Sequence, residues 1–382
     1  MNAGLDYSIA ENVPPELSAQ RKTLRGLSQL KFDLKYFFIQ AAIGNAQDLL
    51  HLLEEFPADV IVADSFFIAA DWVHEQTGIP WAQLGVSALT LPSQDTAPFG
   101  LGLKPNASPL GRFRNRILYG LLQTVIFRSL YADVNEARSQ VSLGATNTLL
   151  FDVLSPYLYL AGTVPGFEYP RSDLPPQVHF IGPLLPATSS THFTPPSWWD
   201  ELNQDIPVIL VTQGTVATDL ADLIIPTLQA LKHEPVLVVA TTGNRSAADL
   251  GAFSPPDNAR VEPFIPFQSL LPFVDVMVTN GGYNGVQMAL AHGIPLVAAG
   301  KSEDKAEICA RIAWRDIGIN LNTKTPKPKQ IRQAVQQVLS DPRYRQNAKQ
   351  LQTEVAQLHP AEQAVALLEA LVQTKQPIIR CP

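Results

Sequence analysis

The sequence contains little cysteine and no long hydrophobic run. Only Cys309 and Cys381 occur, far apart in the chain. This predicts neither a disulfide framework nor a cysteine-based metal site, and it suits a reducing compartment such as the cytosol. No run of about 18 apolar residues is present, which excludes a transmembrane helix. Residues 1–10 are polar and lack the charged start and apolar core of a signal peptide. We therefore expect a cytoplasmic protein.

Charged residues are also few, and acidic ones predominate. They make up 16% of the chain, with 28 Lys and Arg against 35 Asp and Glu and a net charge of −7. No cluster of Lys and Arg is present, so nucleic acid is not an expected partner. The chain has 382 residues, 46% of them hydrophobic, which is enough for about two domains with a sizeable core.

The stretch from Asp275 to Lys305 combines a buried strand, a glycine turn, a helix and a second strand. The β-branched run at 276–278 predicts the first strand, and Asn280-Gly281-Gly282 forms the turn. A helix at 283–292 and a strand at 295–299 complete a βαβ unit of a parallel sheet. The start of this helix offers unpaired N–H groups and a positive dipole end, which would suit a diphosphate. On spacing alone, the Gly-Gly pair is equally often only a tight turn.

This stretch resembles the donor-binding motif of the family 1 nucleotide-sugar glycosyltransferases, which have the GT-B fold. The family has a His-Gly-Gly-aromatic-Asn run, a Gly-hydrophobic-Pro strand, and an acidic residue followed by Gln. Here residues 280–284 read Asn-Gly-Gly-Tyr-Asn, 293–295 read Gly-Ile-Pro, and 304–305 read Asp-Lys. The match is closest to the bacterial macrolide and flavonoid branch. It extends from about Ala58 to Thr374 and is strongest from 207 to 321.

The resemblance implies an α/β protein with two Rossmann-like, doubly wound parallel-sheet domains facing a cleft. We expect an N-terminal acceptor-binding domain at 1–185 and a linker at 186–206, which is rich in Pro, Ser and Thr. A C-terminal nucleotide-sugar-binding domain is expected at 207–360. By resemblance, the helix and tail at 361–382 return to the first domain.

The N-terminal domain is expected to be incomplete. A region at 29–55 has apolar residues near helical spacing. The first recognisable strand, at 58–63, resembles the fourth or so of the family's domain, so at least one βαβ unit of about 30 residues is missing. The family's catalytic histidine lies in that unit, and none of the seven histidines replaces it. His51, His74 and His292 lie in predicted helices, where structural roles are expected.

Asp64 follows the strand at 58–63 and precedes a predicted helix at 68–76, which Gly78 ends and a strand at 80–86 follows. This second βαβ pattern places Asp64 at the carboxyl end of a parallel strand, where α/β folds bind ligands. From the residues alone the favoured role is an N-cap, and the alternative is to orient a histidine or bind a hydroxyl. By resemblance, Asp64 matches the aspartate that supports the catalytic histidine in plant members, here without its partner.

The remaining elements continue the alternation of strands and helices. Further strands are predicted at 157–161, 178–181, 207–212, 234–240, 259–264 and 318–321. Further helices are predicted at 110–139, 149–154, 219–231, 304–314, 328–340, 342–358 and 361–374. The pair Trp198-Trp199 in the linker is expected to pack against one of the domains.

The resemblance assigns the diphosphate to the turn before the helix at 283–292. The expected cradle consists of Thr215, Asn280, Gly281, Gly282, Asn284 and Gly285. From the residues alone, Thr215 is more simply a helix cap. Asn280 stands where many relatives have His, and Gly285 replaces a Ser or Thr and leaves only its N–H. Met288 stands where many relatives have a Glu that holds the ribose, for which Gln287 is the expected substitute.

Five further residues complete the donor site implied by the resemblance. Phe264 would stack on the nucleobase and the backbone of Ile265 would read its edge, although Phe and Ile are commonly core residues. Glu303, Asp304 and Lys305 lie on the same rim of the sheet. Asp304 would bond the sugar hydroxyls, with Lys305 in place of the family's Gln.

The resemblance thus implies a hexosyltransferase. It would move a hexose from a UDP- or dTDP-sugar to a hydroxyl of a small hydrophobic acceptor, such as a macrolide, flavonoid or terpenoid, with inversion. The departing diphosphate needs positive potential, and the attacking hydroxyl needs a base. An Asp-X-Asp element is absent, so we expect no metal and no other cofactor, the nucleotide sugar being a co-substrate.

Two other functions stay open at this point. A catalytically inactive nucleotide-sugar-binding helper protein is favoured by the missing histidine. An epimerase of the UDP-N-acetylglucosamine type shares the fold, but it needs carboxylates and histidines around the sugar, and only Glu303 and Asp304 qualify.

Overall fold

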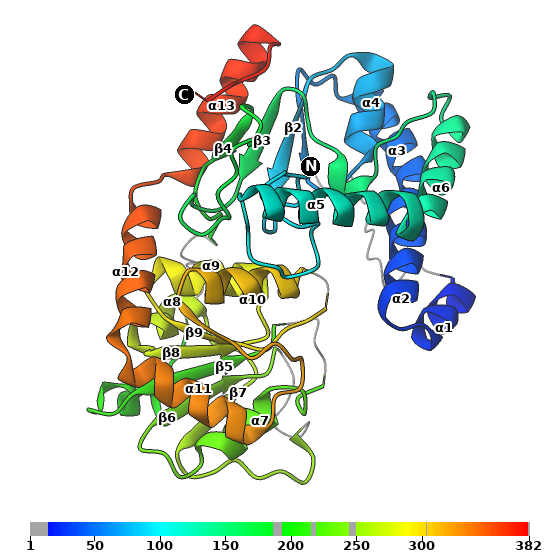
Figure 1. Ribbon diagram of the computed structural model, residues 1–382. Helices are drawn as coiled ribbons and strands as arrows, with labels where there is room; N and C mark the ends of the chain where they lie inside the picture. Colours follow the sequence, from blue (N-terminus) through cyan, green and yellow to red (C-terminus); the bar gives the residue numbers. More distant parts are fainter. Residues whose placement is uncertain (1–13, 186–192, 215–218, 244–249, 303, 381–382) are drawn as a thin grey trace.

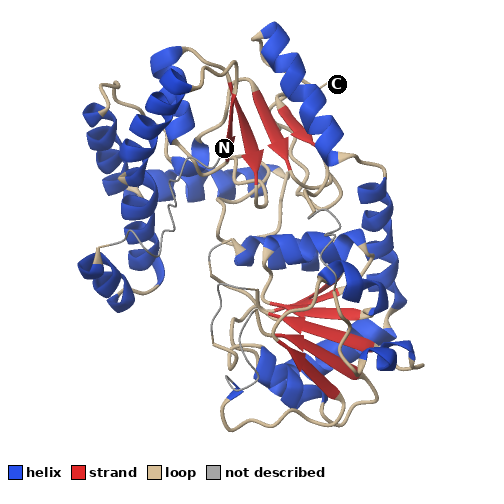
Figure 2. Cartoon of the chain, turned by 180° about the vertical axis from the view of Figure 1, so that it is seen from behind, coloured by secondary structure: helices blue, strands red, loops and turns tan. Residues whose placement is uncertain are grey.

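The computed structural model describes residues 14–185, 193–214, 219–243, 250–302 and 304–380. The chain forms two α/β halves, one above the other in Figure 1, and each half is built around its own sheet. Seen from behind in Figure 2, the two groups of strands are separate, and helices lie between them. All strand pairs in both sheets are parallel. The α/β class and the parallel sheets are therefore confirmed.

The N-terminal sheet has the simple order β1-β2-β3-β4. Its strands are β1 (Ile61–Asp64), β2 (Trp81–Gly85), β3 (Leu158–Ala161) and β4 (Val178–Phe180). Only β3 is buried at every position, whereas the edge strand β1 alternates between buried and exposed residues. A parallel strand reads as a continuous apolar run only where both faces are covered, so β1 is covered mainly on one face.

The C-terminal sheet has the order β10-β9-β8-β5-β6-β7. Its strands are β5 (Val208–Thr212), β6 (Leu237–Thr241), β7 (Ala259–Glu262), β8 (Val276–Thr279), β9 (Leu296–Ala298) and β10 (Gly318–Asn320). The strands β5, β6, β8 and β9 are buried at every position, which explains their Val-rich sequences. The order of strands reverses direction at β5, because β6 lies on one side of it and β8 on the other. In doubly wound sheets such a switch point opens a crevice at the carboxyl ends of the strands.

The helices alternate with the strands as predicted. In the N-terminal half they are α1 (Pro15–Thr23), α2 (Gly26–Asp33), η1 (Leu34–Ile39), α3 (Ala41–Glu55), α4 (Ala69–Thr77), α5 (Pro109–Leu121), η2 (Leu122–Ile126), α6 (Arg128–Gln140) and η3 (Leu150–Asp152). After β4 come η4 (Trp199–Asn203), α7 (Ile224–Leu231), α8 (Phe267–Leu270), η6 (Leu271–Phe273), α9 (Tyr283–Ala291), α10 (Lys305–Trp314), α11 (Pro328–Ser340), α12 (Pro342–Ala356) and α13 (Pro360–Thr374). The elements η1 and η2 are π-helical turns inside long helices, a distortion that is frequent near functional sites.

The last helix, α13, lies against the sheet of the other half (Figure 1). Leu371 is fully buried and packs with Ala82 of β2 and with Leu158 and Leu160 of β3. The tail beyond α13 also reaches this half, because Ile378 N donates to the carbonyl oxygen of Tyr157 at 2.8 Å. The chain thus closes the N-terminal half with its C-terminal residues.

Each predicted strand corresponds to an observed strand, but two helix predictions differ from the structure and one helix was not predicted. The helix predicted at 219–231 begins only at Ile224, since the Asp219 carboxylate accepts from Ala221 N and holds a turn there. The helix predicted at 149–154 is the single turn η3. Helix α1 was not predicted because it is mostly polar and exposed, and a Pro at its first position sets its start.

A buried ion cluster joins the two halves. The Arg311 guanidinium, on α10 and 1% exposed, pairs with Glu168 from the N-terminal half at 2.9 Å and with Glu307 on its own helix at 2.9 Å. Glu307 also accepts hydrogen bonds from the N–H groups of Gly100 and Gly102. Glu168 likewise accepts a hydrogen bond from Leu89 N. Each buried carboxylate therefore has a hydrogen-bond donor besides Arg311, as buried charges require.

Candidate functional site

A pocket of about 230 Å³ opens at the carboxyl ends of β5, β6 and β8, beside the switch point. Its lining includes glycines, strand-end threonines and apolar side chains. The lining residues are Thr212, Gly214, Thr241, Gly243, Pro263, Phe264, Ile265, Phe267, Thr279, Asn280, Gly282, Gly285 and Met288. The structure thus brings together five of the predicted donor-site residues, Phe264, Ile265, Asn280, Gly282 and Gly285.

The glycine turn before α9 has a geometry that other residues would not reproduce. Gly281 has φ +82°, and a Cβ built on it would lie 2.6 Å from Cys309 Sγ. The Asn280 amide links two turns, because its Nδ2 donates to the Gln213 carbonyl while its Oδ1 accepts from Gly282 N at 3.2 Å. No side chain caps α9, so the first N–H groups of the helix face the pocket without a capping acceptor, an arrangement that suits an anion.

The aromatic residue predicted to stack on a nucleobase is placed where it can do so. Phe264 is 64% exposed although it lines the pocket, whereas Ile265 is 1% exposed and belongs to the hydrophobic core. The core interpretation is therefore wrong for Phe264 and right for the side chain of Ile265. A large exposed ring at the edge of this pocket provides a stacking surface.

Other predicted donor residues lie elsewhere or are not described. Asn284 is exposed on α9 and does not line the pocket. Gln287 is wrong as a substitute for the ribose-binding Glu, because it is 2% exposed and donates to Thr163 Oγ1 of the other half. Thr215 and Glu303 lie outside the described residues.

A second cavity, of about 290 Å³ and largely apolar, lies in the N-terminal half. Its walls come from α2, η1, the loops after β1 and β2, α5, η2 and η3, and from the start of α10 in the C-terminal half. They consist of Leu30, Asp33, Leu34, Phe38, Phe66, Thr90, Pro98, Phe99, Gly100, Tyr119, Leu122, Phe127, Leu150, Phe151, Asp152 and Asp304. The Phe151 ring stands edge-on to Phe66 and stacks on Phe99, with ring centroids 6.2 Å apart in both pairs. Such a cavity suits a hydrophobic ring system.

Three carboxylates line this apolar cavity, and their partners differ. Asp33 is held by Arg21 at 2.7 Å, and Asp304 Oδ2 accepts from Ser87 Oγ at 2.6 Å. Burial raises the pKa of Asp152 above its usual value, against a smaller lowering by a backbone hydrogen bond with Leu149. A desolvated carboxylate in a pocket is a candidate general base. Nothing in the sequence indicated a functional role for Asp152, because the residues around it predict only a short helix.

Asp64 does not cap the helix that follows it, so the favoured interpretation is wrong. Its Oδ1 accepts from Phe66 N at 2.7 Å, while α4 begins at Ala69 without any side-chain cap. Burial raises the pKa of the Asp64 carboxyl, and the Phe66 N–H partly offsets this effect. His74 contacts the Ile79 carbonyl oxygen through Nδ1 at 2.8 Å, which confirms its structural role.

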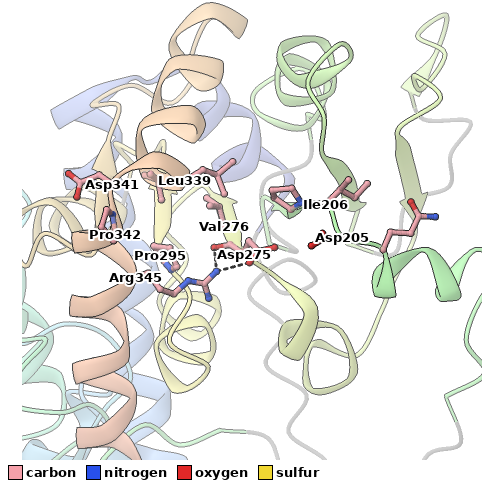
Figure 3. A pocket seen from close by; sticks show the side chains of 12 residues that line it. Asp205, Ile206, Asp275, Val276, Pro295, Leu339, Asp341, Pro342 and Arg345 are labelled. Carbon is pink, nitrogen blue, oxygen red and sulfur yellow. Dashed lines mark hydrogen bonds and ion pairs between the residues drawn. The ribbon is translucent and has the colours of Figure 1, made fainter.

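A wider depression, of about 560 Å³, lies at the opposite end of the C-terminal sheet (Figure 3). Residues at the starts of β5, β8 and β9 form it, including Pro207, Asp275 and Pro295. The Arg345 guanidinium on α12 reaches Asp275 at 2.9 Å across it. Open α/β sheets bind ligands at the carboxyl ends of the strands, so this groove is a helix-packing seam and not the site.

Two absences are observed in the described part of the chain. Across the described ranges between residues 14 and 380, no three His, Cys, Asp or Glu side chains gather as metal ligands would. None of the described helices is both long and apolar enough to cross a bilayer.

Comparison with known proteins identifies the family. The profile described as "Erythromycin biosynthesis protein CIII-like, C-terminal domain" matches residues 223–371. The chain is 46% identical over 359 residues to 4'-demethylrebeccamycin synthase of Lentzea aerocolonigenes, covering 94% of this chain and 84% of that protein. It is 36% identical over 372 residues to UDP-glucosyltransferase 1 of Beauveria bassiana, covering 91% and 80%.

Solved structures agree on the fold. The glycotransferase of kitacinnamycin superposes with a TM-score of 0.70 at 21% identity, covering 92% of this chain and 84% of that chain. The spinosyn rhamnosyltransferase SpnG complexed with thymidine diphosphate gives 0.64 at 18%, covering 93% and 85%. The two parallel-sheet halves are thus the GT-B fold. This chain belongs to the family 1 nucleotide-sugar-dependent glycosyltransferases.

Proposed function

We propose that this protein transfers a hexose from a UDP- or dTDP-sugar to a hydroxyl of a small hydrophobic acceptor, with inversion. The observation that supports this most is the placing of Asp304 and Lys305 between the two pockets. Asp304 lines the apolar cavity, while a Cβ on Gly281 would lie 3.5 Å from the Lys305 carbonyl oxygen. A sugar attached to a diphosphate at the Gly281 turn would therefore extend toward the cavity and reach Asp304.

The donor is expected to bind with its diphosphate at the start of α9 and its base on Phe264. The N–H group of Gly285, with Asn280 and Thr215, would meet the phosphate oxygens, and the backbone of Ile265 would meet the base. The helix dipole and oriented N–H groups stabilise the negative charge that develops on the departing diphosphate. Relatives named as UDP-glucosyltransferases and a neighbour holding thymidine diphosphate support both nucleotides.

The acceptor hydroxyl is expected to lose its proton to Asp152. As the hydroxyl oxygen bonds to the anomeric carbon, the bond from that carbon to the diphosphate oxygen breaks, and the diphosphate leaves with the electron pair. Attack from the side opposite the leaving group inverts the anomeric centre. Asp152 is preferred to Asp64 because it lines the cavity and Asp64 does not. Asp64 remains the second candidate, beside the same loop as Phe66.

The experiment is an assay of purified protein with UDP-glucose or dTDP-glucose and a panel of flavonoids, macrolide aglycones and terpenoid alcohols. Mass spectrometry detects an added hexose, and proton NMR assigns the anomeric configuration of the product. We expect a β-glucoside from an α-linked donor, and equal rates with and without a chelator. A retained configuration or a chelator-sensitive rate would contradict the corresponding part of the proposal.

The variant Gly282→Trp tests whether the donor pocket is used. Gly282 has ordinary φ −61° and 3.5 Å of room for a Cβ, so the indole would fill the pocket without disturbing the turn. Gly144→Trp is the control, since Gly144 is exposed with open space beside it. We expect only Gly282→Trp to lose UDP binding in calorimetric titration. Nucleotide binding without transfer to any acceptor would favour the inactive helper protein instead.

A further inference from the structure

Helix α5 presents a stripe of apolar residues to solvent, while Gly111 and Asn115 on its opposite face are buried against the protein. The exposed side chains recur at helical spacing and continue into η2. They are Leu110, Phe113, Ile117, Leu121 and Val125, at 78%, 59%, 53%, 47% and 63% exposure. The last of them, Val125, lies in the π turn of η2. Isolated exposed apolar residues are ordinary, but a continuous stripe marks an interaction surface.

The opposite face of α5 shows why the helix stays in this orientation. Asn115 is fully buried and donates through Nδ2 to the Gln94 carbonyl oxygen at 2.9 Å. Gly111 packs so closely that a Cβ would lie 2.4 Å from the Asn106 carbonyl oxygen. Arg112 Nε donates to Asp95 at 2.8 Å. The helix is therefore held in this orientation by contacts of its opposite face with the loop before it, and the stripe stays exposed.

The segment that carries the stripe is positively charged along the sequence, in contrast to the whole chain, although Asp173 lines a hollow beside Arg116 in the structure. Between residues 96 and 132 the chain has five cations and no Asp or Glu, within a molecule of net charge −7. They are Lys104, Arg112, Arg114, Arg116 and Arg128. They are not consecutive, so they do not stand out as a cluster along the sequence. Arg112 is paired with Asp95. At 100° per residue Arg114 and Arg116 flank the apolar stripe on either side.

We propose that the α5–η2 stripe docks onto the surface of an anionic lipid bilayer. An exposed apolar face bordered by Lys and Arg is the pattern of helices that lie in the interface plane of a membrane. Anionic lipid headgroups attract each nearby cation. A second copy of the chain is a poorer occupant, because a two-fold contact would set the same cations against each other. This binding is peripheral and requires no spanning helix.

The stripe lies on the helix whose inner side lines the apolar cavity. Tyr119 of α5, Leu122 of η2 and Phe127, directly after η2, are all wall residues of that cavity. A hydrophobic acceptor dissolved in the bilayer would thus be concentrated at the helix that borders its cavity. Only this consequence rests on the proposed function. The docking itself does not depend on sugar transfer.

Flotation of the full chain with lipid vesicles tests the docking. Vesicles of phosphatidylcholine alone are compared with vesicles of equal parts phosphatidylcholine and phosphatidylglycerol, at low and high salt. We expect binding to the anionic vesicles only, weakened by salt because exposed charges are screened. Protein that stays unbound with anionic vesicles at low salt would overturn the proposal.

Matched variants separate the stripe from the rest of the surface. Phe113→Gln with Ile117→Gln should abolish binding, and each of Arg114→Gln and Arg116→Gln should weaken it about fivefold. The apolar control is Val365→Gln on α13, since Val365 is 54% exposed and Ile117 53%.

Folding checks and a charge control accompany the vesicle-binding measurements. Circular dichroism and UDP binding verify that the variants are folded. The charge control is Arg332→Gln on α11, whose side chain is half exposed, and it should leave vesicle binding unchanged. Equal losses in stripe and control variants would overturn the proposal. So would a dimer, seen by light scattering, that the Phe113→Gln and Ile117→Gln changes convert to a monomer, because it would show that a second copy covers the stripe.

Discussion

The pockets of the two halves of the molecule are lined by different kinds of structure. In the C-terminal half seven of the thirteen residues that line the pocket are glycines or threonines at strand ends, set on fully buried strands, so we call this pocket backbone-built. In the N-terminal half the cavity is formed by side chains on helices and loops, including both π-helical turns. A backbone-built pocket suits a ligand part that all donors share, the diphosphate. A side-chain-built cavity can change its shape by substitution, which suits a variable acceptor.

The largest effect is expected where the halves join. Arg311→Ala leaves Glu168 and Glu307 buried without their counter-ion, and we expect a loss of about 3–5 kcal/mol of unfolding free energy. Urea unfolding followed by circular dichroism measures it. The control is Arg343→Met at the exposed pair with Asp341, where we expect no measurable change. An equally stable Arg311→Ala would show that the halves do not depend on this cluster.

In the backbone-built pocket, substitution of Gly281 should be damaging, whereas substitution of Gly282 should be tolerated. Gly281→Ala combines a positive φ with a contact of 2.6 Å to Cys309 Sγ, and we expect a cost of about 2–4 kcal/mol and loss of UDP binding. Gly282→Ala meets nothing closer than 3.5 Å and should retain both stability and binding. Thermal melts and calorimetric titration compare the two. Similar behaviour of both variants would contradict the role given to the turn.

A substitution in the side-chain-built cavity should lower the enzyme's activity without lowering its affinity for the donor. Asp152→Asn is expected to lower kcat/KM about a hundredfold, with UDP affinity unchanged, whereas Asp64→Asn should have a smaller effect. Steady-state rates with a fixed acceptor measure the change. If Asp64→Asn were the more damaging variant, the general base would be Asp64.

The same residue gives a dependence on pH whose sign follows from its raised pKa. The base must be ionised, so kcat/KM should fall as the pH drops through the pKa of Asp152, which lies above the usual value of about 3.9. The contribution of Asp152 to folding stability has the opposite dependence on pH. It is present below the pKa that Asp152 has in the unfolded chain and is lost as the pH rises through its pKa in the folded protein. The Asp152→Asn variant should lack the fall in kcat/KM at low pH. An unchanged acid limb in that variant would remove Asp152 from the mechanism.

The smallest effect concerns the base of the nucleotide. Phe264→Ala should weaken UDP binding about tenfold, since stacking a base on an aromatic ring contributes about 1–3 kcal/mol. Phe56→Ala is a matched control, because Phe56 is 68% exposed and Phe264 64%. Calorimetric titration distinguishes them. Unchanged affinity in Phe264→Ala would show that the ring does not stack on the nucleotide.

The sequence by itself determined the elements and the family. Alternating Val-rich runs, glycine turns and helical spacing placed all ten strands of the described residues, because local propensity and burial on both faces agree in parallel sheets. The glycine turn at 280–282 was also predicted from the sequence, since its backbone conformation restricts which residues fit. Gly78, left-handed at the end of α4, was predicted for the same reason.

Only the tertiary structure decided how side chains from distant segments meet. Asp152 is desolvated in a cavity whose walls come from distant helices and loops. Gln287 donates to Thr163 in the other half, and Asp64 accepts from Phe66 N instead of capping a helix. The outward apolar face of α5 likewise follows from Asn115 meeting Gln94. A sequence pattern shows that a helix has two unlike faces, but which face is buried depends on what packs against it, and that is fixed only by the fold.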